Sequence, residues 1–382
     1  MQNKKYSVLV DTFHLYQALT GIKTYTTELC RGLEAIEDDN IQYVTFPYWK
    51  KALQSSFLRG STSPYIKLLN HFLFFTWKLI VLPIYVVMKR IDVVISPDFV
   101  APMFVSKRVI TMPVIHDLFF WEMPSNYNPI WRPYFLWMIR RGINNRSVLL
   151  TTSEYIKKKI QDTFHYNIPV EVAYQSYRQP ASHNHEIVLS QIHPVLKPEN
   201  YFLHAGVFDV RKNIPFLIKG FSRYLTLSGE SKYLVLVGSA GLSMKHDDWK
   251  TCKQLIDELS LNENVIMPGF VDDAQLECLY KNAFSYIFPS KEEGFGIPVL
   301  EAMYHGSPVI VSKNGPLTEV GGEAVLSFDP DNLNELVDCM FEIREEEKRQ
   351  TLIKKGNEQI KKYSSNHFAA TVHQIIKTHI VK

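Results

Sequence analysis

Short runs of β-branched and aromatic residues recur along the chain, and each is followed by a turn residue and a longer stretch with helical spacing. This alternation is typical of βα units, whose parallel strands are buried on both faces. In the first half, such runs cover residues 7–11, 42–46, 92–96, 109–117, 147–154 and 170–175. In the second half, they cover residues 201–206, 233–238, 264–269, 284–290, 308–312 and 324–328. The pattern therefore predicts two parallel sheets of about six strands each.

The length and the composition agree with a folded protein of two domains. The chain has 382 residues, of which 46% are hydrophobic and 21% charged. At about 100 to 200 residues per domain, this length predicts two domains, each with its own core. A polar link near residues 178–198 separates the two sets of strands, so we place one Rossmann-like domain at residues 1–185 and a second at 186–365. The expected fold class is α/β, with two doubly wound sheets that face a central cleft.

The cysteines and the N-terminal residues indicate the cellular compartment in which the protein is expected. The four cysteines lie far apart and form no CxxC pair, which argues against a zinc knuckle or a dense disulfide framework and suits a reducing environment. Only a three-residue apolar run precedes Asp11, which is too short for a signal peptide. We therefore expect a cytoplasmic protein.

One apolar stretch, Phe72 to Met88, has nearly the length of a membrane span. It has 17 residues and carries Lys78 and Pro83, which places it at the short limit for crossing about 30 Å of hydrocarbon. We expect this stretch to form a buried or membrane-facing helix that does not span a membrane.

Charge is divided unevenly along the chain. Residues 1–180 contain 21 Lys and Arg against 13 Asp and Glu, whereas residues 181–382 contain 21 against 26. Residues 40–91 contain seven Lys and Arg, interleaved with aromatic residues, and no acidic residue. Such a stretch suits an anionic surface at the inner face of the cell membrane, or a phosphate-bearing partner. A solvated basic face is the open alternative, and we expect no nucleic-acid partner.

The most informative motif is FPSKEEGFGIPVLEAMYHGSPVI, residues 288–310. A strand ends there, a loop with charges and glycines follows, and a proline suits the first turn of the next helix. Gly294 and Gly296 allow backbone N–H groups to approach a ligand, and a helix N-terminus adds unpaired donors. Glu293 and Glu301 flank this loop, and carboxylates accept hydrogen bonds from the hydroxyls of a sugar and of a ribose. The motif predicts a diphosphate cradle, and a helix cap with solvated charges is the alternative.

A second motif, HAGVFDVRKNIPFLIKGF, covers residues 204–221. Gly206 ends a strand, and Arg211 and Lys212 lie just before a helical run. Two cations at the carboxyl end of a strand can neutralise the charge that develops on a leaving diphosphate. Taken alone, the pair also fits a solvated helix start.

Two weaker signals lie in the first half. The strand that contains PVIHD opens on His116 and Asp117, and a histidine beside an acid can orient or polarise a reacting hydroxyl. A structural histidine is the open alternative. Gly21 lies in a turn after the first strand, where it would let the backbone approach a ligand.

Several familiar motifs are missing from the sequence. It contains no GxxxxGK[ST] loop, HExxH helix or GxSxG elbow, so P-loop, zincin and α/β-hydrolase functions lose support. The acidic pairs at residues 247–248 and 272–273 are not joined to a histidine or a third acid. We expect that the protein requires no metal ion and no cofactor.

Taken together, these motifs resemble the retaining GT-B glycosyltransferases of family 4. The resemblance rests on residues 11–29, 92–153, 204–213, 268–283 and 288–330. It includes the two-glutamate motif of the family, with seven residues between Glu293 and Glu301. It implies a first domain that binds the acceptor, a second domain that binds the nucleotide sugar, and a last helix at residues 366–382 that packs back on the first domain.

The resemblance also implies roles for single residues. Glu293 would contact the donor sugar and Glu301 the ribose, while His116 would lie beside the reacting carbon. Arg211 and Lys212 would hold the diphosphate, which makes the catalytic set His116, Glu293, Lys212 and Arg211.

Further residues would complete the donor site. The loop after Glu293 would contact donor phosphate or sugar through Gly294, Phe295, Gly296 and Ile297, and the base would lie against Phe270 and Val271. Many members have an arginine after the glycine at position 206. This chain has Val207 there, so that phosphate neutralisation would depend more on Arg211 and Lys212.

The implied activity is transfer of a sugar from a nucleoside diphosphate sugar to a hydroxyl of a glycan or lipid-linked acceptor, in the assembly of a bacterial-type surface polysaccharide. The RKN and TGIKTY segments resemble members that use GDP-mannose, with UDP sugars as the next choice. A sugar-nucleotide epimerase or phosphorylase of the same fold remains open as an alternative, as does a non-catalytic subunit that binds nucleotide sugars. In the implied reaction, positioning and charge stabilisation of the leaving diphosphate provide most of the catalysis.

Overall fold

The computed structural model describes residues 5–18, 21–55, 63–164, 167–178, 187–240 and 248–380. The chain divides into two compact units. Unit 1 consists of Met1–Tyr177 and Tyr363–Lys382, and unit 2 of Arg178–Lys362. The division that the sequence suggested at 185/186 lies outside the described residues. The second division lies at 362/363, three residues before the suggested 365/366.

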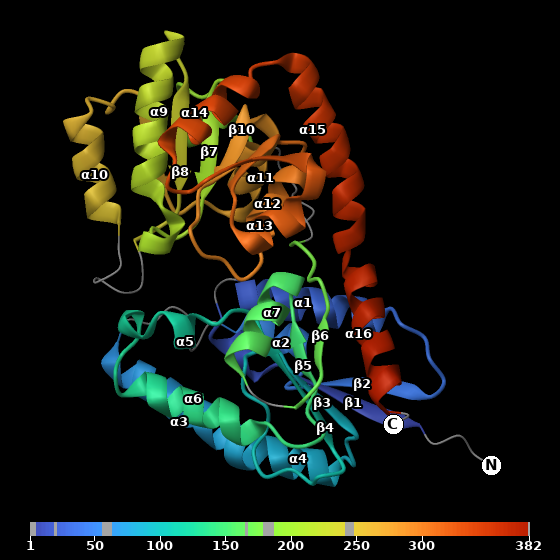
Figure 1. The fold of residues 1–382 in the computed structure, drawn as a ribbon. Coiled ribbons are helices and arrows are strands. Elements are labelled where there is room, and N and C mark those ends of the chain that lie inside the picture. The colour runs from blue at the N-terminus through green and yellow to red at the C-terminus, as the bar shows by residue number, and fades with distance from the viewer. Residues whose placement is uncertain are drawn as a thin grey trace. The chain divides into compact units, whose positions relative to one another are not determined.

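Unit 1 is built on a sheet of six parallel strands (Figure 1). Along the chain these are β1 (Tyr6–Asp11), β2 (Ile41–Phe46), β3 (Val93–Ser96), β4 (Ile110–Ile115), β5 (Leu149–Thr151) and β6 (Val170–Val172). Their order in the sheet is β2-β1-β3-β4-β5-β6. All residues of β3 and β4 are buried, which explains why these strands read as continuous apolar runs.

Unit 2 contains a second parallel sheet of six strands. Its strands are β7 (Tyr201–Ala205), β8 (Tyr233–Val237), β9 (Val265–Gly269), β10 (Ser285–Phe288), β11 (Val309–Ser312) and β12 (Val325–Phe328). Their order is β12-β11-β10-β7-β8-β9. Ten of the twelve predicted runs contain a whole strand, and β1 and β2 begin one residue before their runs, so the predicted α/β class with two parallel sheets is confirmed.

Helices cover the sheet of unit 1. They are η1 (Phe13–Tyr16), α1 (Gly21–Glu34), α2 (Trp49–Gln54), α3 (Pro64–Thr76), η2 (Trp77–Val81), α4 (Leu82–Met88), α5 (Phe119–Glu122), η3 (Pro124–Asn126), α6 (Trp131–Gly142), α7 (Glu154–Thr163) and α16 (Ser365–Ile380). The last of these, α16, packs along α1, where the Ser365 hydroxyl donates a 2.6 Å hydrogen bond to Glu28. Phe368 of α16 is fully buried in the core of unit 1. The end of the chain is thus part of the first unit.

The apolar stretch predicted from Phe72 belongs to a longer helix. The segments α3, η2 and α4 run on without a break, and Tyr65–Met88 forms 24 residues that are long and apolar enough to cross a membrane by length and composition. The helix is thus longer than the 17 residues expected from the sequence, and the expectation that it does not span a membrane stays a prediction. Only 22% of its most apolar window is buried, and η2 has the wider π-helical turn at Trp77 and Lys78, which both point into the unit.

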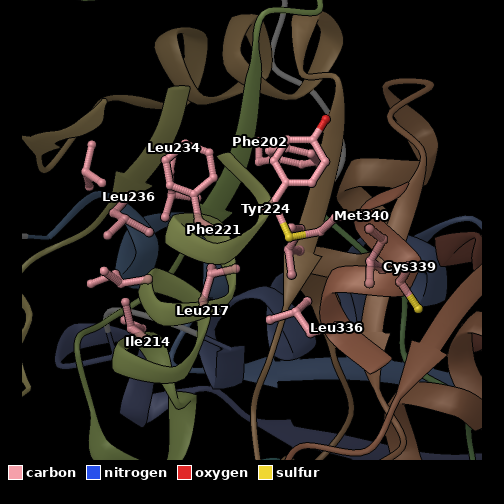
Figure 2. Close-up of a cluster of buried hydrophobic side chains, with 14 of the residues drawn as sticks. Phe202, Ile214, Leu217, Phe221, Tyr224, Leu234, Leu236, Leu336, Cys339 and Met340 are labelled. Carbon is pink, nitrogen blue, oxygen red and sulfur yellow. The ribbon is translucent and has the colours of Figure 1, made fainter. Parts of the chain in front are cut away.

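The helices of unit 2 flank its sheet in the same way. They are α8 (Leu189–Ile192), η4 (Val210–Lys212), α9 (Ile214–Ser228), α10 (Trp249–Glu258), α11 (Asp273–Asn282), α12 (Ile297–Tyr304), α13 (Gly315–Gly321), η5 (Gly322–Ala324), α14 (Leu333–Glu342) and α15 (Glu346–Gln359), and η6 (Ile360–Tyr363) leads back to unit 1. Helix α14 packs against α9 and β12. Figure 2 shows part of the buried core in which side chains of α9 and α14 meet those of β7 and β8, among them Phe202, Leu217, Phe221, Leu234, Leu336 and Met340. This packing holds the strand ends that carry the site.

In each unit the strand order reverses at one point. The reversal lies between β1 and β3 in unit 1 and between β7 and β10 in unit 2. Ligands of open parallel sheets bind outside the carboxyl ends of the strands at such a switch point. A ligand of either unit is therefore expected beside the residues that follow these four strands.

Candidate functional site

A cluster of charged side chains lies at the switch point of unit 2. Lys212, at the end of η4 after β7, places its Nζ 2.6 Å from Oε1 of Glu293, in the loop after β10. Nη1 of Arg211 lies 3.3 Å from the same carboxylate oxygen. Lys212 Nζ also lies 4.5 Å from the centre of the Phe288 ring. The sequence predicted all three charged residues, and the fold brings them into one cluster.

Lys212 and Glu293 form the buried part of this cluster. Lys212 and Glu293 are each 8% exposed. Burial by itself would raise the pKa of Glu293, but the charges of Lys212 and Arg211 outweigh it and hold that pKa below its ordinary value. Glu293 is therefore ionised at neutral pH. Nε of Arg211 also lies 3.5 Å from Oδ1 of Asp209, so that two cations and two carboxylates meet here. An anionic ligand at this position would be attracted by Lys212 and Arg211.

Local hydrogen bonds fix the two loops to each other. The Asp209 side chain accepts a hydrogen bond from the backbone N–H of Arg211, and the carbonyl of Arg211 accepts one from the N–H of Lys291 at 2.8 Å. Asn213 adopts a left-handed conformation at φ 56° and donates to the carbonyl of Pro330 at 3.0 Å. Arg211 and Lys212 are thus held in place from both sides.

The predicted cradle forms the start of α12. Gly296 precedes the helix with φ 110°, and a Cβ atom there would lie 2.7 Å from a methyl carbon of Leu317. Only glycine fits this position. Ile297 is the first helical residue and Phe295 is buried, so that Gly294 to Ile297 lead into the N-terminus of α12, the end of a helix that attracts anions.

Glu301 lies one turn into α12 and has a partner that the sequence did not indicate. Nε of Arg178 lies 3.2 Å from Oε1 of Glu301, and Arg178 also pairs with Asp273 at the start of α11. Burial raises the pKa of Glu301 in spite of the arginine. Arg178 lies in the polar link, where a single arginine gives no sequence signal.

Gly206 follows β7 beside the cluster. A Cβ atom there would lie no closer than 3.6 Å to another side chain, the nearest atom being Nε2 of His204. The chain itself therefore does not require glycine at this position. His204 is fully buried and donates from Nδ1 to the carbonyl of Ile287 at 3.0 Å, which leaves Nε2 as an acceptor.

The two residues predicted to line a base pocket differ in exposure. Phe270 follows β9 and is 85% exposed, whereas Val271 is buried. An exposed aromatic ring next to a strand end offers a face for stacking on a planar base. Both residues stay predictions as parts of a base site.

The remaining predicted residues, His116 and Gly21, belong to unit 1. His116 follows β4, is 9% exposed, and its Nε2 donates to the carbonyl of Pro97 at 2.7 Å. Because of burial, its pKa is lowered to about 4, so that the ring is neutral at pH 7. Gly21 is the exposed first residue of α1.

Unit 1 has its own buried charge cluster at its switch point, which the sequence did not reveal. Nζ of Lys78 lies 2.6 Å from Oδ2 of Asp11, at the end of β1, and 2.7 Å from Oδ1 of Asp98, just after β3. Nε1 of Trp77 donates to the other oxygen of Asp11 at 3.0 Å. Lys78 is fully buried. The one signal for it was a charge within an otherwise apolar run.

The described part of the chain contains no group of three or more His, Cys, Asp or Glu side chains that could hold a metal ion. The cations at the switch point of unit 2 are provided by Arg211 and Lys212.

Comparison with protein families assigns both halves of the chain. Residues 19–176 match the model described as Glycosyltransferase Family 4, and residues 188–359 match the model described as Glycosyl transferases group 1. The first match contains β2 to β6 and the second contains β7 to β12.

Individual relatives are also named as glycosyltransferases. The O-antigen chain mannosyltransferase B of Escherichia coli is 28% identical over 278 residues, which is 70% of each chain. The O-antigen chain mannosyltransferase RfbU of Salmonella typhimurium is 28% identical over 221 residues, 57% of this chain and 56% of that protein. Among solved structures, sucrose-phosphate synthase from Thermosynechococcus elongatus matches 99% of this chain and all of its own at a TM-score of 0.71 and 18% identity, which indicates a shared fold.

Proposed function

The chain belongs to the group 1 glycosyltransferases of the GT-B fold, and we propose that it moves mannose from GDP-mannose to a hydroxyl of a glycan or lipid-linked acceptor. The observation that carries this proposal is the contact of Lys212 and Arg211 with Glu293 at the switch point of unit 2. Two cations beside a helix N-terminus suit a leaving diphosphate, and a carboxylate suits the hydroxyls of the sugar next to it.

The choice of mannose rests on the relatives. Two bacterial relatives with 28% identity are named as O-antigen mannosyltransferases. The same names support a role in surface polysaccharide assembly. GDP-mannose is therefore the first donor to test, and UDP sugars are the next.

We also propose retention of configuration and independence from metal ions. Glu293 is held by Lys212 and Arg211, which lowers the pKa of its carboxyl group and makes it a poor nucleophile. The acceptor hydroxyl would attack from the side that the diphosphate leaves, and the diphosphate would accept its proton. Arg211 and Lys212 would provide the charge that a divalent cation provides elsewhere.

A panel of nucleotide sugars tests the donor. The true donor stabilises the folded protein by mass action, so GDP-mannose should raise the melting temperature more than GDP-glucose, UDP-glucose or UDP-galactose. Radiolabelled sugar from the stabilising donor should then appear in a lipid or glycan fraction. Conversion or breakdown of the donor without any acceptor would indicate an epimerase or phosphorylase instead, and stabilisation without turnover would indicate a binding subunit.

The acceptor side of the proposal includes an anionic membrane. The helix of α3, η2 and α4 exposes a row of large apolar side chains at Tyr65, Leu68, Leu69, Phe72, Ile80, Ile84, Val87 and Met88. Tyr65, Leu68 and Phe72 in α3, and Ile80, Ile84, Val87 and Met88 in the second half of the helix, follow the spacing of three or four residues that places side chains on one helix face. Its other side is anchored in unit 1 by Trp77, Leu82 and Val86.

The basic residues near this helix face suggest that it contacts a lipid surface with anionic head groups. Lys67, Lys89 and Arg90 lie on or directly after the same helix, and residues 40–91 contain no acidic side chain. Basic residues near such a membrane contribute about 1 kcal/mol each, and salt screens this attraction. The helix would lie in the plane of the interface with its apolar face in the lipid.

Sedimentation with vesicles tests the membrane proposal. The protein should bind vesicles that contain phosphatidylglycerol at low salt, and less so at high salt or with neutral lipid. Replacing Phe72 and Ile84 by Glu should abolish binding, whereas Leu227→Glu, at an exposed apolar position of α9, should not. Equal binding by both variants, or no binding by the unmodified protein, would favour a soluble acceptor.

A further inference from the structure

Helix α6 lies beside α3 in unit 1 and is joined to it by aromatic side chains (Figure 1). The rings of His71 and Trp131 stack with their centres 4.1 Å apart. The centre of the Phe75 ring lies 5.9 Å from that of Tyr134 and 6.5 Å from that of Trp137. Rings at these separations attract each other, so α6 is held against the helix whose apolar face we place on lipid. A surface that meets this face therefore also comes close to α6.

The exposed side chains of α6 are apolar in its first half and cationic in its last turn. Ile130, directly before the helix, is 77% exposed, and Trp137 is 41% exposed. Arg140 and Arg141 follow in the last turn and are also exposed. Together with the exposed Pro133, these positions are separated by steps of three or four residues. They therefore lie on one face of the helix.

No acidic side chain lies near these arginines in the sequence. Residues 123–153 contain four arginines, no lysine, and no Asp or Glu. Within the part of the chain that the structure describes, neither Arg140 nor Arg141 forms an ion pair. The guanidinium carbon of Arg141 lies 5.9 Å from the centre of the Trp137 ring, within the range at which an aromatic face attracts a cation. Two guanidinium groups are thus presented to a partner beside an exposed indole.

The chemistry of these side chains favours phosphate within a lipid surface. A guanidinium group offers two parallel N–H donors that match two oxygens of a phosphate, whereas a lysine acts as a point charge. An indole favours the boundary between head groups and acyl chains, where its ring is in apolar and its N–H in polar surroundings. The exposed row of Tyr65, Leu68 and Phe72 on the neighbouring α3 requires an apolar partner as well. Phospholipid provides both parts, whereas RNA or free phosphate would leave this row in water.

We propose that Trp137, Arg140 and Arg141 form a site for the phosphates of phospholipid head groups. This inference rests on the proposed function for the presence of a membrane, and it concerns bulk lipid, separate from the donor and the acceptor. The indole would lie at the head-group boundary and the two arginines among the phosphates. Because such pairs depend on the planar guanidinium geometry as well as on charge, lysines should not replace the arginines.

Sedimentation with phosphatidylglycerol vesicles tests the two arginines. The double variant Arg140→Lys and Arg141→Lys keeps both charges but loses the paired donors, so its partition coefficient should fall about fivefold to tenfold. Arg223→Lys, at an exposed position of α9 in unit 2, is the control and should bind like the unmodified protein. An unchanged partition coefficient in the double variant would overturn the site, because the arginines would then act only as charges.

Fluorescence quenching tests the position of the indole. Phospholipids with bromine atoms on the acyl chains quench the tryptophans that reach them, and the chain has six tryptophans. Trp137→Phe should remove most of the quenching that occurs on vesicles. Trp249→Phe, which removes a tryptophan of α10 in unit 2, should not. An equal quenched fraction in both variants and in the unmodified protein would show that α6 does not reach the lipid.

Further outcomes separate this site from the other proposals. If Phe72→Glu with Ile84→Glu abolishes vesicle binding while the double lysine variant binds normally, the membrane contact stands and the head-group site is wrong. Absence of vesicle binding by the unmodified protein would overturn both. Binding of single-stranded RNA that is as tight as vesicle binding and depends equally on the two arginines would make nucleic acid the partner, against the inference. Stabilisation by GDP should be the same in all these variants, so its absence would contradict the proposed transferase and leave the lipid site in place.

Discussion

Nζ of Lys212 lies 2.6 Å from Oε1 of Glu293, although 81 residues separate them in the chain. The contact exists because β7 and β10 pair directly in the sheet of unit 2, so that the loops after both strands meet. In the proposed reaction, Lys212 would thereby be placed in advance where the leaving diphosphate gains negative charge. Preorganised charge of this kind costs no rearrangement during the reaction.

Replacing Lys212 by Ala should slow sugar transfer strongly. Loss of one preorganised donor to a developing anion costs about 2 to 4 kcal/mol in the transition state. The fall in kcat/KM for the donor measures this loss. Lys291→Ala is the control, because Lys291 lies in the Glu293 loop but pairs with the exposed Asp331. Near-normal turnover in Lys212→Ala would remove the lysine from the catalytic set.

Replacement of Glu293 by Ala should lower turnover, whereas replacement of Glu301 by Ala should lower the affinity for GDP. Removal of Glu293 takes one negative charge away from Arg211 and Lys212, so affinity for free GDP should stay the same or rise while turnover of the sugar donor falls. Removal of Glu301 should weaken GDP binding itself, because the proposed ribose contact is lost. Calorimetric titration with GDP, combined with steady-state kinetics, separates the two effects.

The Arg178 pair provides a control for the second glutamate. Arg178 and Glu301 contact each other at 3.2 Å, so Arg178→Ala tests whether a disturbed Glu301 is enough to lower GDP affinity. Equal loss of GDP binding in Glu293→Ala and Glu301→Ala would show that the two glutamates do not have separate roles.

The sequence predicted the strands and the unit 2 cluster for a physical reason. Parallel strands buried on both faces read as apolar runs, and the loops after them carry the ligand residues in any doubly wound sheet. Lys212 and Glu293 are each adjacent to such a strand end, so local patterns were sufficient to find them.

Other residues could not be found in this way, because only the tertiary fold gives them meaning. Lys78 lies in the middle of an apolar helix, and its burial depends on Asp11 and Asp98, which belong to two different strand ends. Arg178 reaches Glu301 across 123 residues. Its position in a polar link gave no reason to connect it with a carboxylate on α12.

Two glycines of unit 2 should respond oppositely to Ala. Gly296→Ala forces a Cβ atom to within 2.7 Å of Leu317 at φ 110°, so it should destabilise unit 2 by about 1 to 3 kcal/mol. Gly206→Ala meets nothing closer than 3.6 Å and should unfold like the unmodified protein, yet weaken donor binding by occupying space beside Lys212. Urea denaturation and GDP titration of both variants check this pair. Normal donor affinity in Gly206→Ala would show that the donor does not approach this position.

Removal of divalent cations should leave transfer intact. Arg211 and Lys212 place two positive charges on the proposed diphosphate position, which meets the need for charge neutralisation. Enzyme dialysed against EDTA should therefore transfer sugar at a rate within about twofold of the untreated enzyme. A loss of activity that Mg²⁺ or Mn²⁺ restores would show that the two side chains are not sufficient.

Acidification should destabilise unit 2 through His204. Burial, as the largest cause, lowers the pKa of this histidine to about 4, compared with 6.5 in an unfolded chain. The unfolded state therefore takes up a proton first as the pH falls. The resulting contribution to stability is complete above about pH 6.5 and is lost between about pH 6.5 and 4, with a total of about 3 kcal/mol.

His204→Gln can still donate a hydrogen bond toward the carbonyl of Ile287 but does not titrate, so its free energy of unfolding should fall less between pH 7.5 and pH 5 than that of the unmodified protein. Urea denaturation at both pH values measures the difference, and parallel losses in the two proteins would place the acid sensitivity at other groups.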